Sequence, residues 1–225
     1  MTIPLSDNST ASAGALLVID PALPPYHGLA ICDVVLVDTE DRAREATIAL
    51  LVADAVGFDT ESKPTFAKGE ISTGPHLIQL ATDGKAYLFQ TCRPFGLDRV
   101  KAVLESAAIV KVGFGLEGDA ALLRIRFGIS LANVLDLARA LRPEGQKNTI
   151  GARTAVAQFF KQKLQKSRRI STSNWASQHL SERQLLYAAD DAHVALRIYR
   201  MAGEQLRADE ITNKTCTSNL NSRFV

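Results

Sequence analysis

With 225 residues, 46% of them hydrophobic, and no visible repeat, the chain can bury the core of one domain flanked by tails. Its net charge of +2 is compatible with nucleic-acid binding but does not indicate it. Its three cysteines lack metal-ligand spacing and an even count, which excludes a disulfide framework. Because no segment is long and apolar enough to cross a bilayer and the N-terminus lacks a signal pattern, we expect a soluble intracellular protein, cytoplasmic in a bacterium or nuclear in a eukaryote.

The N-terminal part of the chain predicts an arm followed by a β-α-β unit. Residues 1–28 are rich in Ser, Ala, Thr and Pro, and we expect a tail or an arm lying on the domain. The next elements are a strand over 32–37, a helix over 41–52 and a strand over 55–59. Where this helix begins, Asp38 or Thr39 is a natural N-cap, and the acids of Asp38-Thr39-Glu40 face the helix dipole. We therefore expect this tripeptide to be structural.

A second Asp-Thr-Glu tripeptide, Asp59-Thr60-Glu61, ends the buried strand over 55–59. Strand side chains alternate with a period of two, so Asp59 and Glu61 point to the same side. Two like charges there repel each other unless a cation neutralises them, and the spacing suits Mg²⁺ or Mn²⁺, which prefer oxygen ligands. The alternative is that the acids simply close the strand, so partners elsewhere in the chain must decide.

The middle of the chain predicts a mixed sheet. Residues 62–75, which include Phe66 and Lys68, form a mobile loop beside the strand end, a position that commonly carries substrate contacts. The turn signal Asp83-Gly84 joins two apolar runs into a β-hairpin over 77–82 and 86–90. The elements that follow are a helix over 97–106, a strand over 109–113, a helix over 115–127 stopped by Gly128, and a helix over 133–141.

Two acids and a basic run stand out in the second half. Glu117 and Asp119 lie in the first turn of the helix over 115–127. A helix over 149–162 leads into the densest positive run, Lys161 to Arg169, which is either a solvated helix face or a phosphate-binding patch. Trp175 is expected to be a core anchor.

The late helix separates two adjacent aspartates. A capping box at Ser181 opens a helix that is expected to run to about Leu206, before a C-terminal tail over 208–225. Asp190 belongs to a polar stripe of this helix, where a solvated side chain is expected. Asp191 belongs to the apolar stripe, where an unpaired carboxylate is costly, and Tyr187 lies one turn before it on the same face.

Three motifs therefore follow one another: Asp59-Thr60-Glu61 at a strand end, Leu116-Glu117-Gly118-Asp119 at a strand-to-helix junction, and Tyr187-Ala188-Ala189-Asp190-Asp191 on a late helix. The set resembles the DEDD 3′→5′ exonuclease superfamily in its tyrosine subclass. Within it, the chain resembles the Werner-type exonuclease domains, and RNase D is a more distant relative. The likeness covers roughly residues 33 to 205 and includes Leu77-Ile78-Gln79-Leu80, Tyr87-Leu88-Phe89 and Ser173-Asn174-Trp175.

The resemblance implies an α/β fold of the RNase H-like kind, a mixed sheet flanked by helices, as an exonuclease domain over 29–207. It implies two divalent cations, Mg²⁺ or Mn²⁺, and four carboxylates that hold them. Asp59, Glu61 and Asp191 would hold one cation, Asp59 and Asp119 the second, and Tyr187 would orient the attacking water.

The implied activity is removal of nucleoside monophosphates from a 3′ end, with DNA favoured and RNA possible. The implied partner is thus a nucleic-acid strand, and no membrane is involved. The residues assigned to contacts with the nucleic-acid strand are Thr60, Phe66, Lys166, Arg168 and Arg169. A histidine general base is not expected, because Leu186 stands where the histidine subclass needs His, and His193 is assigned to the polar stripe.

Two other interpretations stay open. One is a catalytically inactive member of the fold that only binds nucleic acid or a protein, although all four acids and Tyr187 are present. The other is RNA trimming of the RNase D kind. RNase D carries additional helical domains for which this chain has no room, and this favours the Werner-type interpretation.

Overall fold

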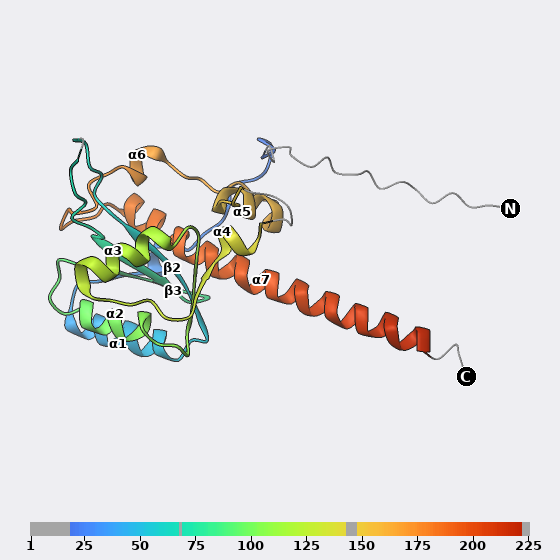
Figure 1. The fold of residues 1–225 in the computed structure, drawn as a ribbon. Helices are drawn as coiled ribbons and strands as arrows, with labels where there is room; N and C mark the ends of the chain where they lie inside the picture. The colour runs from blue at the N-terminus through green and yellow to red at the C-terminus, as the bar shows by residue number, and fades with distance from the viewer. Residues whose placement is uncertain (1–18, 68, 143–147, 222–225) are drawn as a thin grey trace.

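A computed structural model describes residues 19–67, 69–142 and 148–221 (Figure 1). Within these residues, six strands form one mixed sheet in the order β1-β4-β3-β2-β5-β6. β1 pairs with β4, β2 with β5 and β5 with β6 in parallel, and the two remaining pairs are antiparallel. The strands are β1 (Val34–Val37), β2 (Ala55–Glu61), β3 (Leu77–Ala81), β4 (Ala86–Gln90), β5 (Val110–Gly113) and β6 (Val134–Asp136).

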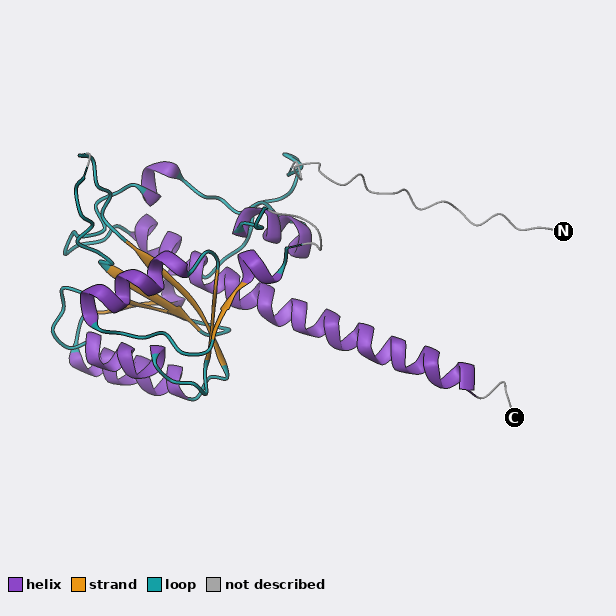
Figure 2. Cartoon of the chain, in the orientation of Figure 1, coloured by secondary structure: helices purple, strands orange, loops and turns teal. Residues whose placement is uncertain are grey.

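Helices cover both faces of this sheet (Figure 2). α1 (Glu40–Leu51), α2 (Leu97–Leu104) and α3 (Glu117–Phe127) lie on one face, and α7 (Glu182–Asn221) crosses the other. The remaining helical segments are η1 (Ile31–Asp33), α4 (Leu137–Ala140), α5 (Ala152–Phe160) and α6 (Arg168–Ser171). None of the described helices is long and apolar enough to cross a membrane.

The alternation of strand side chains divides the core into two layers. On β2, Val56 and Phe58 are fully buried in the cluster under α1, α2 and α3. Ala55 points to the opposite face and packs in a cluster with Val194 and Ile198 of α7. The face of β2 that continues through Asp59 and Glu61 is therefore the α7 face.

A glycine allows α7 to lie directly on β2. A Cβ at Gly57 would come within 1.9 Å of the Ala192 carbonyl oxygen of α7, so the strand backbone and the helix backbone are in contact there. Asp191 is the chain neighbour of Ala192, and Asp59 lies two residues after Gly57. This contact between β2 and α7 therefore brings the Asp59 and Asp191 carboxylates close together.

The described part of the N-terminal arm lies on the domain. The backbone N–H of Tyr26 donates to the Lys163 carbonyl at 3.0 Å, and the N–H of Lys163 donates to the Pro24 carbonyl at 2.8 Å. The Tyr26 ring is buried, and the Arg197 guanidinium lies 5.4 Å from its centre and 4.6 Å from that of Phe160. The domain boundaries predicted from sequence stay predictions.

The local signals predicted from sequence are found where expected. Thr39 is the N-cap of α1 and accepts from the Arg42 N–H, Gly128 closes α3 with a φ of 61°, and the hairpin β3–β4 is antiparallel. The capping box is also present, since Ser181 N donates to Gln184 Oε1 at 3.0 Å. Trp175 is fully buried.

Three predicted helices need correction. The helix over 133–141 begins as strand β6, because Val134 to Asp136 pair with β5 before α4 starts. The helix over 149–162 ends at Phe160, where Lys161 adopts a left-handed conformation, so most of the basic run is not a helix face. α7 continues past Leu206 to Asn221, since no Gly or Pro stands between 204 and 221 to stop it.

Candidate active site

The side chains of the three polar residues at the end of β2 point to opposite faces of the sheet. Asp59 and Glu61 point to the α7 face, while Thr60 points to the opposite face and its hydroxyl donates to Asp119 Oδ1 of α3. The Thr60 N–H also donates to Asp59 Oδ1 at 2.8 Å. Thr60 therefore links the carboxylates of β2 and α3.

The two acids in the first turn of α3 have different environments. Asp119 faces β2 and is bonded by Thr60. The Glu117 side chain is 80% exposed and pairs with Arg139 of α4. Of these two acids, the structure thus brings Asp119 into the carboxylate cluster.

Asp191 enters the cluster from α7. It is buried, and Tyr187 precedes it by one helical turn on the same face. The Tyr187 ring packs on buried Trp175, with 6.1 Å between the ring centroids, which fixes the position of the phenol. Asp59, Glu61, Asp119, Asp191 and Tyr187, from β2, α3 and α7, therefore lie near enough to one another for their charges to interact.

Burial raises the pKa of all four carboxylates, and repulsion within the cluster adds to this for Asp59 and Glu61. Burial and then repulsion from Asp191 and Asp119 hold the pKa of Asp59 well above its usual range. Burial and then repulsion from Asp59 raise the pKa of Glu61 to about 9. Burial also raises the pKa of Asp119 and of Asp191. Such a cluster is stabilised by any cation that enters it.

In this structure the cation beside Asp191 is a lysine. Lys166 Nζ lies 3.0 Å from Asp191 Oδ1 and 6.0 Å from the centre of the Tyr187 ring. Its charge also lowers the pKa of Asp59 and Glu61, against the effect of burial. Sequence reasoning assigned Lys166 to phosphate binding and missed this contact.

The donor set fits hard divalent cations. Four carboxylates supply oxygen ligands and balance two divalent charges. Across the described ranges, however, no three His, Cys, Asp or Glu side chains converge in metal-binding geometry. Lys166 is instead bonded to one of the four acids.

The remaining residues assigned to nucleic-acid binding lie at the surface. Phe66 is 84% exposed in the loop after β2, and Arg168 and Arg169 have exposed side chains on α6. Lys68 lies outside the described residues. Of the residues assigned to nucleic-acid binding, the structure places Thr60 and Lys166 against the carboxylates.

Asp190 is not the solvated residue that its stripe predicts. Its Oδ1 accepts from the Leu29 N–H at 3.2 Å, and burial and then repulsion from Asp191 raise its pKa to about 6. His193, also assigned to the polar stripe, is buried and its Nε2 lies 3.1 Å from the Asp83 carbonyl oxygen. The N-terminal arm and the β3–β4 turn cover this side of α7.

Gln79 is a neighbour of the site that received no role from sequence. It lies opposite Asp59 in the β2–β3 ladder and is fully buried. Neither atom of its side-chain amide has a hydrogen-bond partner among the described residues. A polar residue within the apolar run Leu77 to Ala81 was the signal that could have singled it out.

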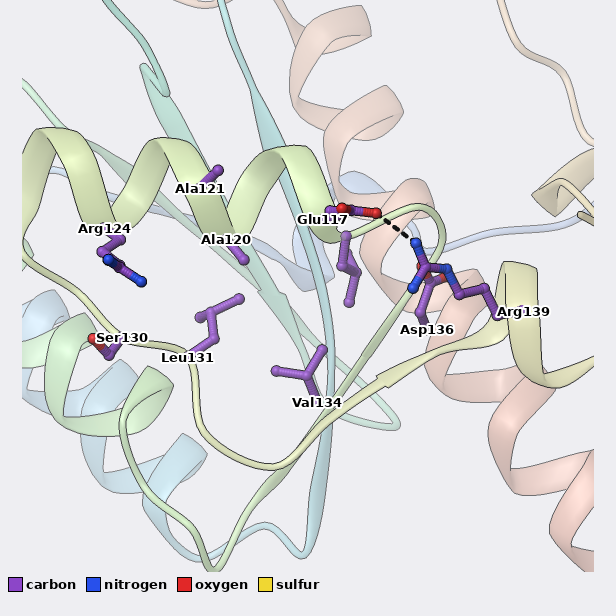
Figure 3. A pocket seen from close by; sticks show the side chains of 10 residues that line it. Glu117, Ala120, Ala121, Arg124, Ser130, Leu131, Val134, Asp136 and Arg139 are labelled. Carbon is purple, nitrogen blue, oxygen red and sulfur yellow. Dashed lines mark hydrogen bonds and ion pairs between the residues drawn. The ribbon is translucent and has the colours of Figure 1, made fainter.

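A cavity of about 420 Å³ lies on the other side of α3 (Figure 3). Ala120, Ala121 and Leu131 supply an apolar lining, and the Glu117–Arg139 ion pair closes one end. Asp119 is not among the residues that line it. Asp136 does line it, but its Oδ1 already accepts from the N–H groups of Gly115 and Ala138. The cavity is thus separate from the carboxylate cluster.

The fold to be compared with known proteins is a mixed sheet flanked by helices, and four acids and a tyrosine lie near the end of its strand β2. A sequence model described as 3'-5' exonuclease matches residues 34–207, and the chain belongs to this family. Members of the family typically use divalent metal ions. The fold predicted from sequence is confirmed, because it is shared with RNase D of Escherichia coli, at 25% identity and a TM-score of 0.62 over 78% of this chain and 45% of that one.

Similar proteins come from several organisms. A 3'-5' exonuclease of Arabidopsis thaliana is 30% identical over 65% of this chain and 51% of its own length. The mouse bifunctional 3'-5' exonuclease/ATP-dependent helicase WRN is 31% identical over 74% of this chain and 12% of its own length. The EXO domain of Aedes aegypti Nibbler shares the fold at 27% identity, with a TM-score of 0.68 over 84% of this chain and 99% of that one. The chain thus spans about half of the Arabidopsis protein and a small part of the mouse protein.

Proposed function

We propose that the protein is a metal-dependent 3′→5′ exonuclease that releases nucleoside monophosphates from the 3′ end of a nucleic-acid strand. DNA is the favoured strand, by likeness to the Werner-type enzymes, and RNA is the alternative. The observation that carries the proposal is the meeting of Asp59, Glu61, Asp119, Asp191 and Tyr187 at one end of β2.

The carboxylates would be the metal ligands. Asp59, Glu61 and Asp191 would hold one cation, and Asp59 and Asp119 would hold the second. Two bound divalent cations supply a nucleophile from water at neutral pH and stabilise the leaving oxygen of the phosphodiester. Tyr187, held against Trp175, would orient the attacking water.

Two further features would support this chemistry. The Thr60 hydroxyl holds Asp119 toward β2, so the ligands of the second cation are positioned by one strand end. The exposed Arg168 and Arg169, together with Lys166, supply positive charge for the phosphates of the strand, and Phe66 offers an exposed ring to the terminal base. These contacts position a strand and do not select its sequence.

The test is digestion of DNA and RNA strands of one sequence, labelled at the 3′ or the 5′ end, with Mg²⁺, Mn²⁺ or EDTA. We expect the 3′ label to be released as a mononucleotide, with either metal and not with EDTA. The two Asp-Thr-Glu tripeptides provide a matched pair of variants. Asp59→Ala should be inactive, and Asp38→Ala should cleave like wild type, because Asp38 pairs with Arg42 at the surface.

Binding of the strands without cleavage in either metal would instead identify an inactive member of the family. Release of label from the 5′ end, or cleavage that survives in Asp59→Ala, would also contradict the proposal. A preference between the DNA and RNA strands in the same assay identifies the substrate.

A further inference from the structure

Lys166 places a positive charge inside the carboxylate cluster. Its Nζ lies 3.0 Å from Asp191 Oδ1, and the Asp191 side chain is only 5% exposed. A sheltered pair of this kind is screened less than a surface pair, and removal of one partner leaves the other charge buried and unpaired. The contact is therefore different in kind from the exposed charges of Arg168 and Arg169.

The backbone on both sides of Lys166 is anchored. Lys163 N donates to the Pro24 carbonyl at 2.8 Å, the Leu164 side chain is buried, and the Arg153 guanidinium donates to the Lys166 carbonyl. Leu164 is buried and Lys166 reaches Asp191 of α7, so both side chains point toward the domain. The ammonium is thus held at the cluster by the fold.

We propose that Lys166 is a tethered counter-ion that competes with a divalent cation for Asp191. This inference rests on the proposed function, because it takes Asp191 as a metal ligand. In the metal-free chain the ammonium pairs with the buried Asp191 carboxylate. A cation that binds Asp191 must displace the ammonium, which then becomes free to pair with a phosphate of the strand.

Removal of the lysine charge should therefore lower the melting temperature of the metal-free protein and raise its affinity for the metal. Without its counter-ion, the metal-free protein should melt at a lower temperature, because the buried Asp191 carboxylate is left unpaired. Without its competitor, the metal should bind more tightly. A lysine that only binds phosphate, or one that supports the metal ligands, would not produce both effects.

The experiment compares wild type with Lys166→Met, Lys166→Arg and Lys163→Met. Lys163 is the matched control, because its side chain is exposed and it lies three residues away on the same segment. Melting temperatures are measured in EDTA, and Mn²⁺ binding by titration calorimetry. For Lys166→Met we expect a lower melting temperature and Mn²⁺ affinity raised about tenfold, which is about 1.4 kcal/mol. Lys163→Met and the charge-conserving Lys166→Arg should stay close to wild type.

Equal or weaker Mn²⁺ binding by Lys166→Met would overturn the inference, even if wild type binds the metal as proposed. Failure of wild type to bind Mn²⁺ at all would overturn the proposed metal site as well. A second measurement needs no variant. Acetylation of wild type, quantified by mass spectrometry, should label Lys166 more strongly relative to Lys163 once Mn²⁺ is added, and an unchanged ratio would also overturn the inference.

Discussion

Gly57→Ala tests whether the contact between β2 and α7 sets the geometry of the site. The added Cβ would lie 1.9 Å from the Ala192 carbonyl oxygen, whereas ordinary contacts begin at 3.4 Å. The two backbones must therefore separate by about 1.5 Å, the difference of these two values. The Cβ position is fixed by the β2 backbone and the oxygen belongs to the α7 backbone, so no side-chain rotation can relieve the clash.

The expected effect on stability follows from overpacking, which costs about 1–3 kcal/mol. For a chain of this size, that corresponds to a fall in melting temperature of about 2–12 °C. The displacement also moves Asp191, the neighbour of Ala192, away from Asp59. A shift of about 1 Å in a catalytic group can cost about 10²-fold in rate, so cleavage should fall by roughly that factor.

Melting temperature and 3′-end release with Mn²⁺ are measured on the same preparations. Gly203→Ala, the same type of substitution on α7, is the control, because a Cβ there meets no described atom within 4 Å. It should keep full activity and gain up to about 1 kcal/mol of stability from helix propensity. Gly57→Ala with the melting temperature and rate of wild type would refute the reasoning.

Four further outcomes are expected. Asp191→Asn should lose at least about 10³-fold in the rate of 3′-end release, because it loses a metal ligand. Asp190→Asn should stay active in the same assay, because its amide oxygen can still accept from the Leu29 N–H. In EDTA, Asp59→Asn should melt above wild type, and it should gain less from Mn²⁺ than wild type does. Tyr187→Phe should be impaired less than Asp59→Ala in the cleavage assay, because a hydroxyl that orients water is one contributor among several. The pKa of Glu61 is raised in the fold to about 9, so its stabilising contribution is complete below the unfolded value of 4.5 and is lost as pH rises through 9. Wild type in EDTA should accordingly lose melting temperature between about pH 5 and about pH 9, and Glu61→Gln should lose less.

The parts of the site that sequence predicted depend on short-range geometry. The period of a strand places Asp59 and Glu61 on one side, and the period of a helix places Tyr187 and Asp191 on one side. Both relations hold within a few residues and need no knowledge of the rest of the fold. The order of the motifs along the chain supplied the connection between them, through the resemblance to a family.

The contact between Lys166 and Asp191 could not be predicted in this way. The two residues belong to different elements, and the segment that carries Lys166 is held by the N-terminal arm, through the pairing of Pro24 with Lys163. A run of positive charge is compatible with solvent, with phosphate or with a buried carboxylate. The choice among these is made by tertiary packing, as is the pairing of the three-residue strand β6 with β5.

The two adjacent aspartates show which patterns constrain a structure. An apolar stripe must be buried, so a carboxylate within it must have a partner, and this one-way rule singled out Asp191. A polar stripe can face water, but it can equally be covered by polar groups. On α7 it is covered. Asp190 accepts a hydrogen bond from the N-terminal arm, His193 contacts the β3–β4 turn, and the Arg197 guanidinium packs against the rings of Tyr26 and Phe160. The polarity of a helix face therefore predicts the chemistry of its partners, while its exposure depends on which other segments of the chain fold over it.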